Sequence, residues 1–166
     1  MNIRALVIGS VFLAAGAPAL AAGTHCSQAE ETVFSCNLGH KVVSVCASQE
    51  VTQHSGYIQY RFGALGRKPE LSFPKTTVKP GKVIQARTLM FAGGGGDYLR
   101  FNSGKTSYIV YSAIGKGWGT KDGVAVERHG KLATHLECQD VPTSKMGRFF
   151  FDQAGLREDA REFELP

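Results

Sequence analysis

The residues that could support catalysis are dispersed along the chain and form no recognisable catalytic set. Asp97 and Glu127 could act as the paired carboxylates of a glycoside hydrolase, but the sequence places no general acid beside a base. The Gly-x-Ser-x-Gly turn that carries the nucleophile of many serine hydrolases is absent. The five histidines are scattered, without metal-ligand spacing. We therefore expect no enzyme activity, no metal and no cofactor, with a glycan hydrolase as the least favoured alternative.

Binding chemistry is concentrated between residues 93 and 118, where Tyr, Arg, Lys and the single Trp of the chain occur between two glycine clusters. Such side chains are common in binding surfaces. We predict two strands joined by a tight turn at Ser103-Gly104-Lys105, because Asn102 and Gly104 tolerate positive φ. Exposed hairpin tips suit insertion into the cleft of a partner. The predicted partner-binding residues are Ser103, Gly104, Lys105, Tyr108, Lys116, Trp118 and Arg100.

Two glycine-rich segments of this stretch have simpler structural interpretations. Residues 93–96 lack the Lys-Ser/Thr pair of a phosphate-binding loop, so we expect a bulge or the entry to a strand. Residues 115–119 predict an exposed loop, in which Trp118 either covers one end of the core or contacts a partner.

Residues 1–22 have the pattern of a secretory signal peptide. Arg4 precedes an apolar run over residues 5–15 that is too short to span a bilayer, and Ala19-Leu20-Ala21 supplies the small residues of a cleavage site. We predict cleavage near Ala21 or Ala22, a periplasmic location and a single β domain over residues 23–166. No later segment is apolar enough to span a membrane.

The charge of the chain limits the class of partner. The formal net charge is +5, or about +4 once Arg4 is removed with the signal peptide, and no run of Lys and Arg exceeds two residues. A nucleic-acid-binding protein would need a denser basic patch. A mild basic charge instead suits an acidic envelope polymer or an acidic protein partner.

Four cysteines follow the signal peptide, and in an oxidising compartment they predict two disulfides. The segments 32–36 and 41–47 are expected to form a hairpin with Cys36 opposite Lys41. Cys46 would then lie roughly 16 Å from Cys36, too far for a disulfide. This excludes Cys36–Cys46 together with Cys26–Cys138. Of the two remaining pairings we favour Cys26–Cys36 with Cys46–Cys138.

The hydrophobic pattern has a period of two over most of the chain, which indicates strands. Residues 56–62, for example, place Ile58, Tyr60 and Phe62 on one face. Residues 75–81, between Pro74 and Pro80, are expected to form a surface loop. The remaining strands are expected at 71–73, 83–91, 97–102, 106–113, 123–128 and 131–138. Eight or nine short strands with frequent turns predict an all-β fold, an antiparallel sandwich or a flattened barrel.

The C-terminal tail, residues 144–166, differs in character. A short helix is expected near residues 156–163, and Phe149, Phe150 and Phe151 are expected to pack on the sheets, because three adjacent phenylalanines in water would be costly.

Several segments resemble a group of exported proteobacterial proteins of unknown function: residues 43–48, 59–63, 93–96, 98–101 and 108–112. More remotely, the chain is similar to the periplasmic inhibitors of invertebrate-type and chicken-type lysozymes. Those small exported β proteins place a Ser-Gly loop, followed shortly by a Tyr, in the active-site cleft of lysozyme. Ser103-Gly104 followed by Tyr108 resembles that element, although in the chicken-type inhibitors the Tyr follows more closely. The resemblance implies steric inhibition, with Ser103 bonded to a catalytic carboxylate.

Two functions outside catalysis follow from these observations. The first is inhibition of a lysozyme-like cell-wall hydrolase by the Ser103 hairpin, with Lys116 and Trp118 nearby. Because like charges repel, a basic inhibitor suits a less basic lysozyme better than a strongly basic one. The second is an envelope module that binds peptidoglycan or another acidic polymer through Arg61, Arg100, Lys105 and Lys116.

Overall fold

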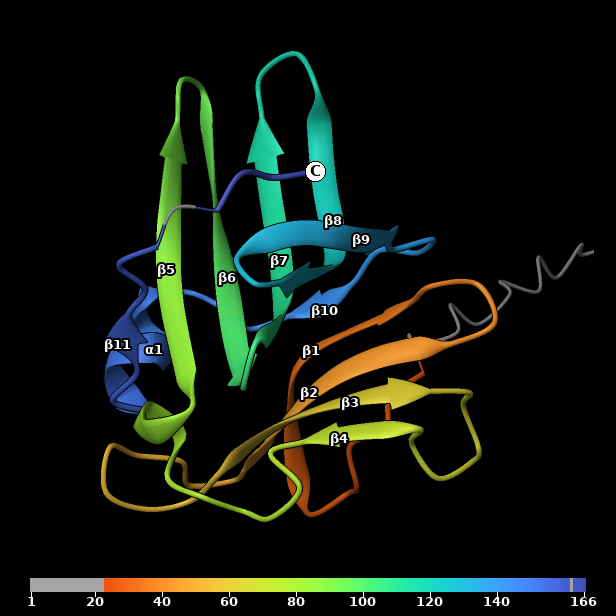
Figure 1. The fold of residues 1–166 in the computed structure, drawn as a ribbon, viewed down its shortest axis with the longest axis vertical. Coiled ribbons are helices and arrows are strands. Elements are labelled where there is room, and N and C mark those ends of the chain that lie inside the picture. Colours follow the sequence, from red (N-terminus) through yellow and green to blue (C-terminus); the bar gives the residue numbers. More distant parts are fainter. Residues whose placement is uncertain (1–22, 162) are drawn as a thin grey trace, which may run out of the picture.

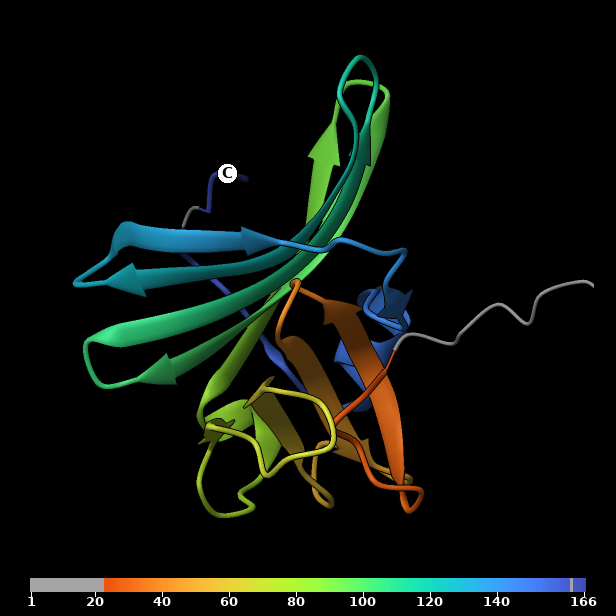
Figure 2. The same cartoon turned by 90° about the vertical axis from the view of Figure 1, so that its right-hand side faces the viewer.

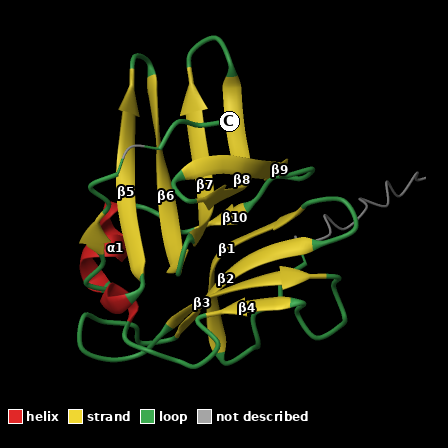
Figure 3. Ribbon diagram, in the orientation of Figure 1, coloured by secondary structure: helices red, strands yellow, loops and turns green. Residues whose placement is uncertain are grey.

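The computed structural model describes residues 23–161 and 163–166, and the predicted signal peptide and its cleavage site lie outside these residues. The described chain folds into two β-sheets and one short helix (Figures 1 and 3). The first sheet has the strand order β10-β1-β2-β3-β4 and the second β11-β5-β6-β7-β8-β9. The sheets share a core and do not close into a barrel, so the all-β prediction is confirmed and the arrangement is sandwich-like.

The nine predicted strands correspond to β1 to β9, and the structure adds two short strands, β10 and β11, that were not predicted. The five-stranded sheet contains β1 (Glu30–Asn37), β2 (Val42–Ser48), β3 (Ile58–Gly63), β4 (Leu71–Phe73) and β10 (Thr143–Ser144). The six-stranded sheet contains β5 (Ile84–Phe91), β6 (Gly94–Ser103), β7 (Thr106–Gly115), β8 (Gly119–Arg128), β9 (Lys131–Glu137) and β11 (Arg157–Glu158). A 3-10 turn, η1 (Pro80–Lys82), precedes β5, and within the described residues no helix is long and apolar enough to cross a membrane.

Alternating apolar residues of both sheets form the main core. From β3, Ile58 and Tyr60 point inward and Phe62 packs at the edge, as the sequence pattern predicts. From β6, Leu99 and Phe101 meet them on the face of the six-stranded sheet that we call the inner face. The opposite face, which carries Tyr98 and Arg100 of β6, Ile109 and Tyr111 of β7 and Ala125 of β8, is the outer face.

The two disulfides join Cys26 to Cys46 and Cys36 to Cys138. The favoured pairing of Cys26–Cys36 with Cys46–Cys138 is therefore wrong, whereas the exclusion of Cys36–Cys46 is confirmed. Cys36 lies opposite Val43, not Lys41, and Cys46 is three residues beyond Val43, so the two cysteines point to opposite faces of the sheet. Cys36 faces the core, where Cys138 packs, and Cys46 faces outward, where the N-terminal segment brings Cys26.

The helix lies elsewhere in the tail than the sequence predicts. Helix α1 (Arg148–Gln153) contains the three phenylalanines. Phe150 and Phe151 are buried as expected, but Phe149 is 85% exposed, so the expectation that it packs on the sheets is wrong: three consecutive helical residues cannot all face the core. The predicted helix near 156–163 is wrong, because Arg157 and Glu158 form β11 alongside β5 and Asp159 is buried beside Arg100. Tertiary pairing and burial outweigh the helix propensity of this charged segment.

The C-terminal segment, residues 159–161 and 163–166, covers part of the outer face. Phe163 contacts Tyr98 and Tyr111, and Leu165 packs against the same cluster. The six-stranded sheet bends strongly, and the chain end lies inside the bend, on the concave side (Figure 2). The outer face therefore has a small core of its own.

Candidate functional site

The predicted partner-binding residues lie in three places: at one end of the six-stranded sheet, at its other end, and in its buried interior. Strands β6 and β7 are each ten residues long and antiparallel, with the Ser103–Thr106 turn at one end and the 115–119 turn at the other. At strand rise the two turns lie about 30 Å apart, and Figure 2 shows the bend of the sheet between them. Lys116 and Trp118 are therefore not near Ser103, contrary to the prediction.

A pair of hairpin turns forms the end that carries Gly104 and Lys105. The β8–β9 turn, His129-Gly130, lies beside the β6–β7 turn, and the His129 backbone N–H donates a 2.8 Å hydrogen bond to the Lys105 carbonyl oxygen. Arg128 and Lys131 flank this second turn and are exposed, as are Lys105 and His129. We call Gly104, Lys105, Arg128, His129 and Lys131 the basic tip. None of its lysines or its arginine forms an ion pair within residues 23–161 and 163–166.

Two features of the basic tip reduce the stability of the fold. Arg128 and Lys131 are directly opposite in the β8–β9 ladder, and like charges in that position destabilise a hairpin. His129 has φ of 53°, the left-handed conformation that glycine or asparagine adopts more readily. Features that cost stability and remain solvent-exposed are commoner where a surface serves a partner.

Ser103 and Tyr108 differ in how far a partner can reach them. Ser103 is half-buried at the end of β6, opposite Thr106. Tyr108 points to the inner face, where its ring stacks on Tyr60 with centroids 5.3 Å apart and an interplanar angle of 21°. Tyr108 therefore joins the two sheets and is only half-exposed.

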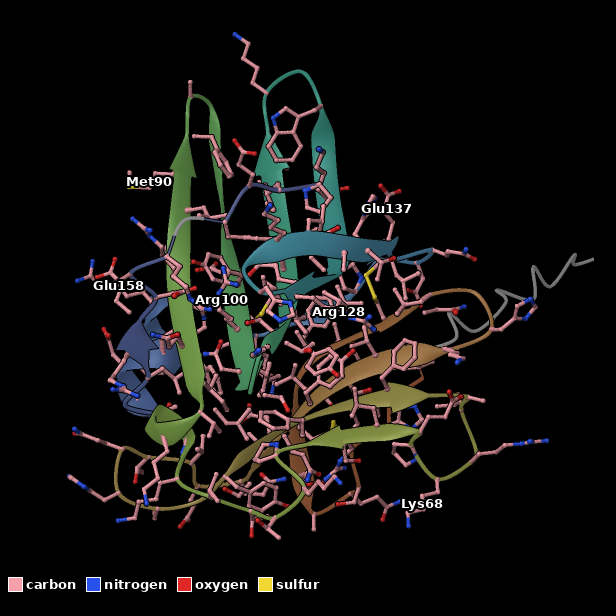
Figure 4. All side chains as sticks on the ribbon, viewed as in Figure 1. Lys68, Met90, Arg100, Arg128, Glu137 and Glu158 are labelled. Carbon is pink, nitrogen blue, oxygen red and sulfur yellow. A yellow bond between two sulfur atoms is a disulfide. The ribbon has the colours of Figure 1, made fainter. Side chains whose placement is uncertain are left out.

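Arg100 is buried in the outer face, fully shielded from solvent, and lies between β5 and β7 (Figure 4). Its Nε donates to Asp159 and its Nη1 to Glu127, both at short range. Burial opposes the charged guanidinium, but these two carboxylates outweigh burial and raise the pKa of Arg100. Burial would likewise raise the pKa of Asp159, yet the hydrogen bond from Arg100 holds it below its usual range. Arg100 thus fixes the C-terminal segment and offers nothing to a partner.

Arg61 is neutralised in a similar way on the other sheet. Its Nη1 and Nη2 donate to the two carboxylate oxygens of Glu30 at 2.8 and 2.6 Å. Burial alone would raise the pKa of Glu30, but hydrogen bonds from Arg61, the Ser27 backbone and Tyr57 lower it to about 2. Of the four cations of the polymer-binding hypothesis, two are therefore paired internally, and Lys105 and Lys116 lie at opposite ends of the sheet.

The other end of the sheet carries Trp118, whose indole lies on Gly115. A Cβ at position 115 would be 2.2 Å from the indole ring, so this contact requires glycine. Phe91 meets the indole edge-on at 5.8 Å, and the Lys121 ammonium lies 5.7 Å from its centroid. Trp118 is still 39% exposed, so it both covers the sheet and presents an aromatic surface.

The two carboxylates considered for hydrolysis do not come together. Asp97 shares the inner face with Leu99 and accepts a 2.7 Å hydrogen bond from Thr88. Glu127 is on the outer face, where it is held by Arg100. Residues on opposite faces of one sheet cannot act on the same glycosidic bond. No cluster of three metal-ligating side chains occurs among the described residues.

No known protein-family model matches the chain, and no curated protein or solved structure gives a significant match.

Proposed function

We propose that this chain is a non-enzymatic binding protein whose basic tip enters an acidic cleft of a protein partner. The observation that carries the proposal is the presence of three exposed cations, Lys105, Arg128 and Lys131, on two adjoining hairpin turns with no internal ion pair among the described residues. A cation without an internal partner is available to a carboxylate of another molecule, and complementary charge speeds association and fixes orientation.

A cell-wall hydrolase of the lysozyme type is the partner that fits this tip best. Glycoside hydrolases keep two carboxyl groups in an open cleft, which a narrow basic hairpin pair can enter. Ser103 at the base of the tip would donate its hydroxyl to one of those carboxylates. The two disulfides suit an oxidising, exported compartment. In this proposal the signal peptide is cleaved near Ala21 or Ala22, and the mature β-sandwich domain acts in the periplasm.

The test is an inhibition assay of the oxidised mature chain against invertebrate-type, chicken-type and goose-type lysozymes in parallel. We expect inhibition of at least one class. The triple variant Lys105→Glu, Arg128→Glu, Lys131→Glu should raise the inhibition constant at least tenfold, about 1.4 kcal/mol. The matched control Lys68→Glu, Lys75→Glu, Lys79→Glu changes the net charge equally on exposed loops near the other sheet and should leave inhibition nearly unchanged. Lys68 is labelled in Figure 4.

Three outcomes would count against the proposal. Equal losses in both triple variants would assign the effect to net charge and not to the tip. Inhibition that survives reversal of the tip would place the contact elsewhere. Absence of inhibition in all three classes, together with salt-sensitive retention on peptidoglycan, would favour the polymer-binding function.

A further inference from the structure

A groove of about 570 Å³ lies beside the end of β8 that is remote from the basic tip. Strand β9 pairs with β8 from Gly123 to Arg128, and the Cys138 backbone N–H donates a 2.9 Å hydrogen bond to the Asp122 carbonyl oxygen. Residues 119–121 of β8 have no neighbouring strand on that side. From Gln139, whose N–H donates to the Asn37 carbonyl oxygen, the chain diverges from β8, and residues 138–142 form the far wall. The side chains that the argument uses are Tyr111, Trp118, Lys121, Asp122 and Glu137. Figure 4 labels Glu137 at the end of β9.

The groove has an aromatic platform in a fixed position. The indole of Trp118 is held by the Gly115 backbone beneath it and by the edge contact with Phe91. It therefore loses little conformational freedom when a flat apolar surface packs on it. Lys121 donates to the main-chain oxygen of Pro166, which draws this cation towards the C-terminal segment.

A largely buried tyrosine, Tyr111, borders the same groove. Tyr111 is 1% exposed, and its ring extends across Gly123, where an added Cβ would be 3.0 Å from the hydroxyl. Among the described residues the Tyr111 hydroxyl forms no hydrogen bond, although Tyr111 lines the groove. Burial, then the charges of Glu137 and Asp122, raises the pKa of Tyr111 to about 12. The hydroxyl is therefore a proton donor at neutral pH, with two carboxylates nearby but unbonded to it.

We propose that this groove binds a sugar unit of a neutral or amino-sugar glycan. The apolar face of the pyranose ring packs on Trp118, its hydroxyls donate to Glu137, which lies on the same face of the sheet as Tyr111, and the Tyr111 hydroxyl donates to a ring or hydroxyl oxygen. A sugar has an apolar ring face, which complements the indole of Trp118, and hydroxyls that both donate and accept hydrogen bonds, which complement the polar side chains of the groove. A polyanion is disfavoured because carboxylates outnumber the single lysine of the groove. The inference is independent of the proposed function, since the groove and the basic tip are at opposite ends of the sheet.

Because Trp118 is the only tryptophan, its fluorescence reports on the groove directly. The oxidised mature chain is titrated with oligosaccharides of N-acetylglucosamine, glucose in β1,4 linkage and glucose in α1,4 linkage. We expect saturable fluorescence change with at least one series. Calorimetry should give the same Kd, and it should detect no binding to Trp118→Ala.

The variant Tyr111→Phe removes only the hydroxyl and keeps the ring that packs on Phe163. Loss of a hydrogen bond in a largely buried site should raise Kd about five- to tenfold. The matched control is Tyr98→Phe, which removes an outer-face hydroxyl bonded to Asp159 and outside the groove, and it should leave Kd unchanged.

Two results would overturn the inference: no binding of any series at millimolar concentration, or a Kd unaffected by Tyr111→Phe. Fluorescence change with spermidine but with no oligosaccharide would assign the groove to cations instead. The triple variant Lys105→Glu, Arg128→Glu, Lys131→Glu should bind oligosaccharide as the native chain does. The Tyr111→Phe variant should inhibit lysozyme as the native chain does. Failure of one proposal therefore leaves the other testable.

Discussion

The six-stranded sheet handles positive charge in two contrasting ways. In the middle of its outer face, Arg100 is buried and held by Asp159 and Glu127. At its tip, Lys105, Arg128 and Lys131 are exposed without an ion pair in the described chain, and Arg128 is directly opposite Lys131. A buried cation must be paired to be tolerated, whereas like charges side by side in solvent slightly destabilise the fold. The contrast separates charge that maintains the structure from charge that is available to a partner.

Removal of the buried cation should have the largest effect. Arg100→Met leaves the buried Asp159 carboxylate without its main partner, so we expect a loss of about 3–5 kcal/mol in the free energy of unfolding. Arg128→Met, at the tip, should change it by less than about 0.5 kcal/mol. Urea denaturation with the disulfides intact measures both. Equal effects of the two substitutions would abolish the contrast between the two regions.

Acid should act on paired charges and spare the tip. The Glu30 pKa is lowered to about 2 by Arg61 and its other hydrogen-bond donors. A group with a depressed folded-state pKa stabilises the fold above its unfolded-state pKa and loses that effect as pH falls through the folded value. The advantage of the native chain over Glu30→Gln should therefore be about 2–3 kcal/mol at pH 6 and decline between pH 5 and 2.

The control for this titration is the triple tip variant Lys105→Met, Arg128→Met, Lys131→Met, which removes no internally paired carboxylate. Its stability difference from the native chain should stay nearly constant over the same pH range. A pH-independent difference for Glu30→Gln would show that the Arg61–Glu30 pair does not depend on ionisation of Glu30.

The C-terminal segment depends on aromatic packing as well as on Arg100. Phe163 contacts Tyr98 and Tyr111 at centroid distances of 5.1 and 5.8 Å. Because Phe163 is half-buried, Phe163→Ala should cost about 1–3 kcal/mol, less than truncation of a fully buried phenylalanine. Phe149→Ala, at an 85% exposed side chain, is the matched control and should be nearly neutral. Hydrogen exchange at residues 159–166 distinguishes local release of the segment from global unfolding.

Local pattern is sufficient to predict strands β1 to β9 of this chain, but not the two-residue strands β10 and β11, which form only by pairing with β1 and β5. Period-two alternation at residues 56–62 and the Ser103-Gly104-Lys105 turn depend on neighbouring residues only, and both are observed. The disulfides depend on which face each cysteine occupies. The observed register is shifted by two residues from the predicted hairpin, and a shift of two leaves every side chain on the same face, so Cys36 and Cys46 lie on opposite faces in both registers. The sequence does not show which distant segment reaches each face, Cys138 on the core side and Cys26 on the other.

The candidate sites were less predictable because they depend on contacts between distant segments. The sequence identifies Lys105 and Trp118 as surface residues, but the ten-residue strand β7 lies between them and separates the two turns. Arg128 and Lys131 flank a predicted turn, yet only the fold brings that turn beside Lys105. The burial of Arg100 required Asp159, from a segment predicted as helix. In the sequence, the two basic residues that flank the His129-Gly130 turn, Arg128 and Lys131, are the signal that indicates this part of the site.

The smallest expected effect tests whether the tip is optimised for the fold. Lys131→Glu replaces a like-charge pair opposite Arg128 with an opposite-charge pair, so it should stabilise the protein by up to about 1 kcal/mol. The same substitution removes one cation of the proposed partner surface and should weaken inhibition. Thermal unfolding at low and high salt isolates the charge term, because screening should reduce the gain. A variant that is more stable but binds less well would show that Lys131 serves partner binding and not the stability of the fold. A variant that is less stable would mean that Lys131 contributes to the hairpin, and the contrast with Arg100 would then be one of degree.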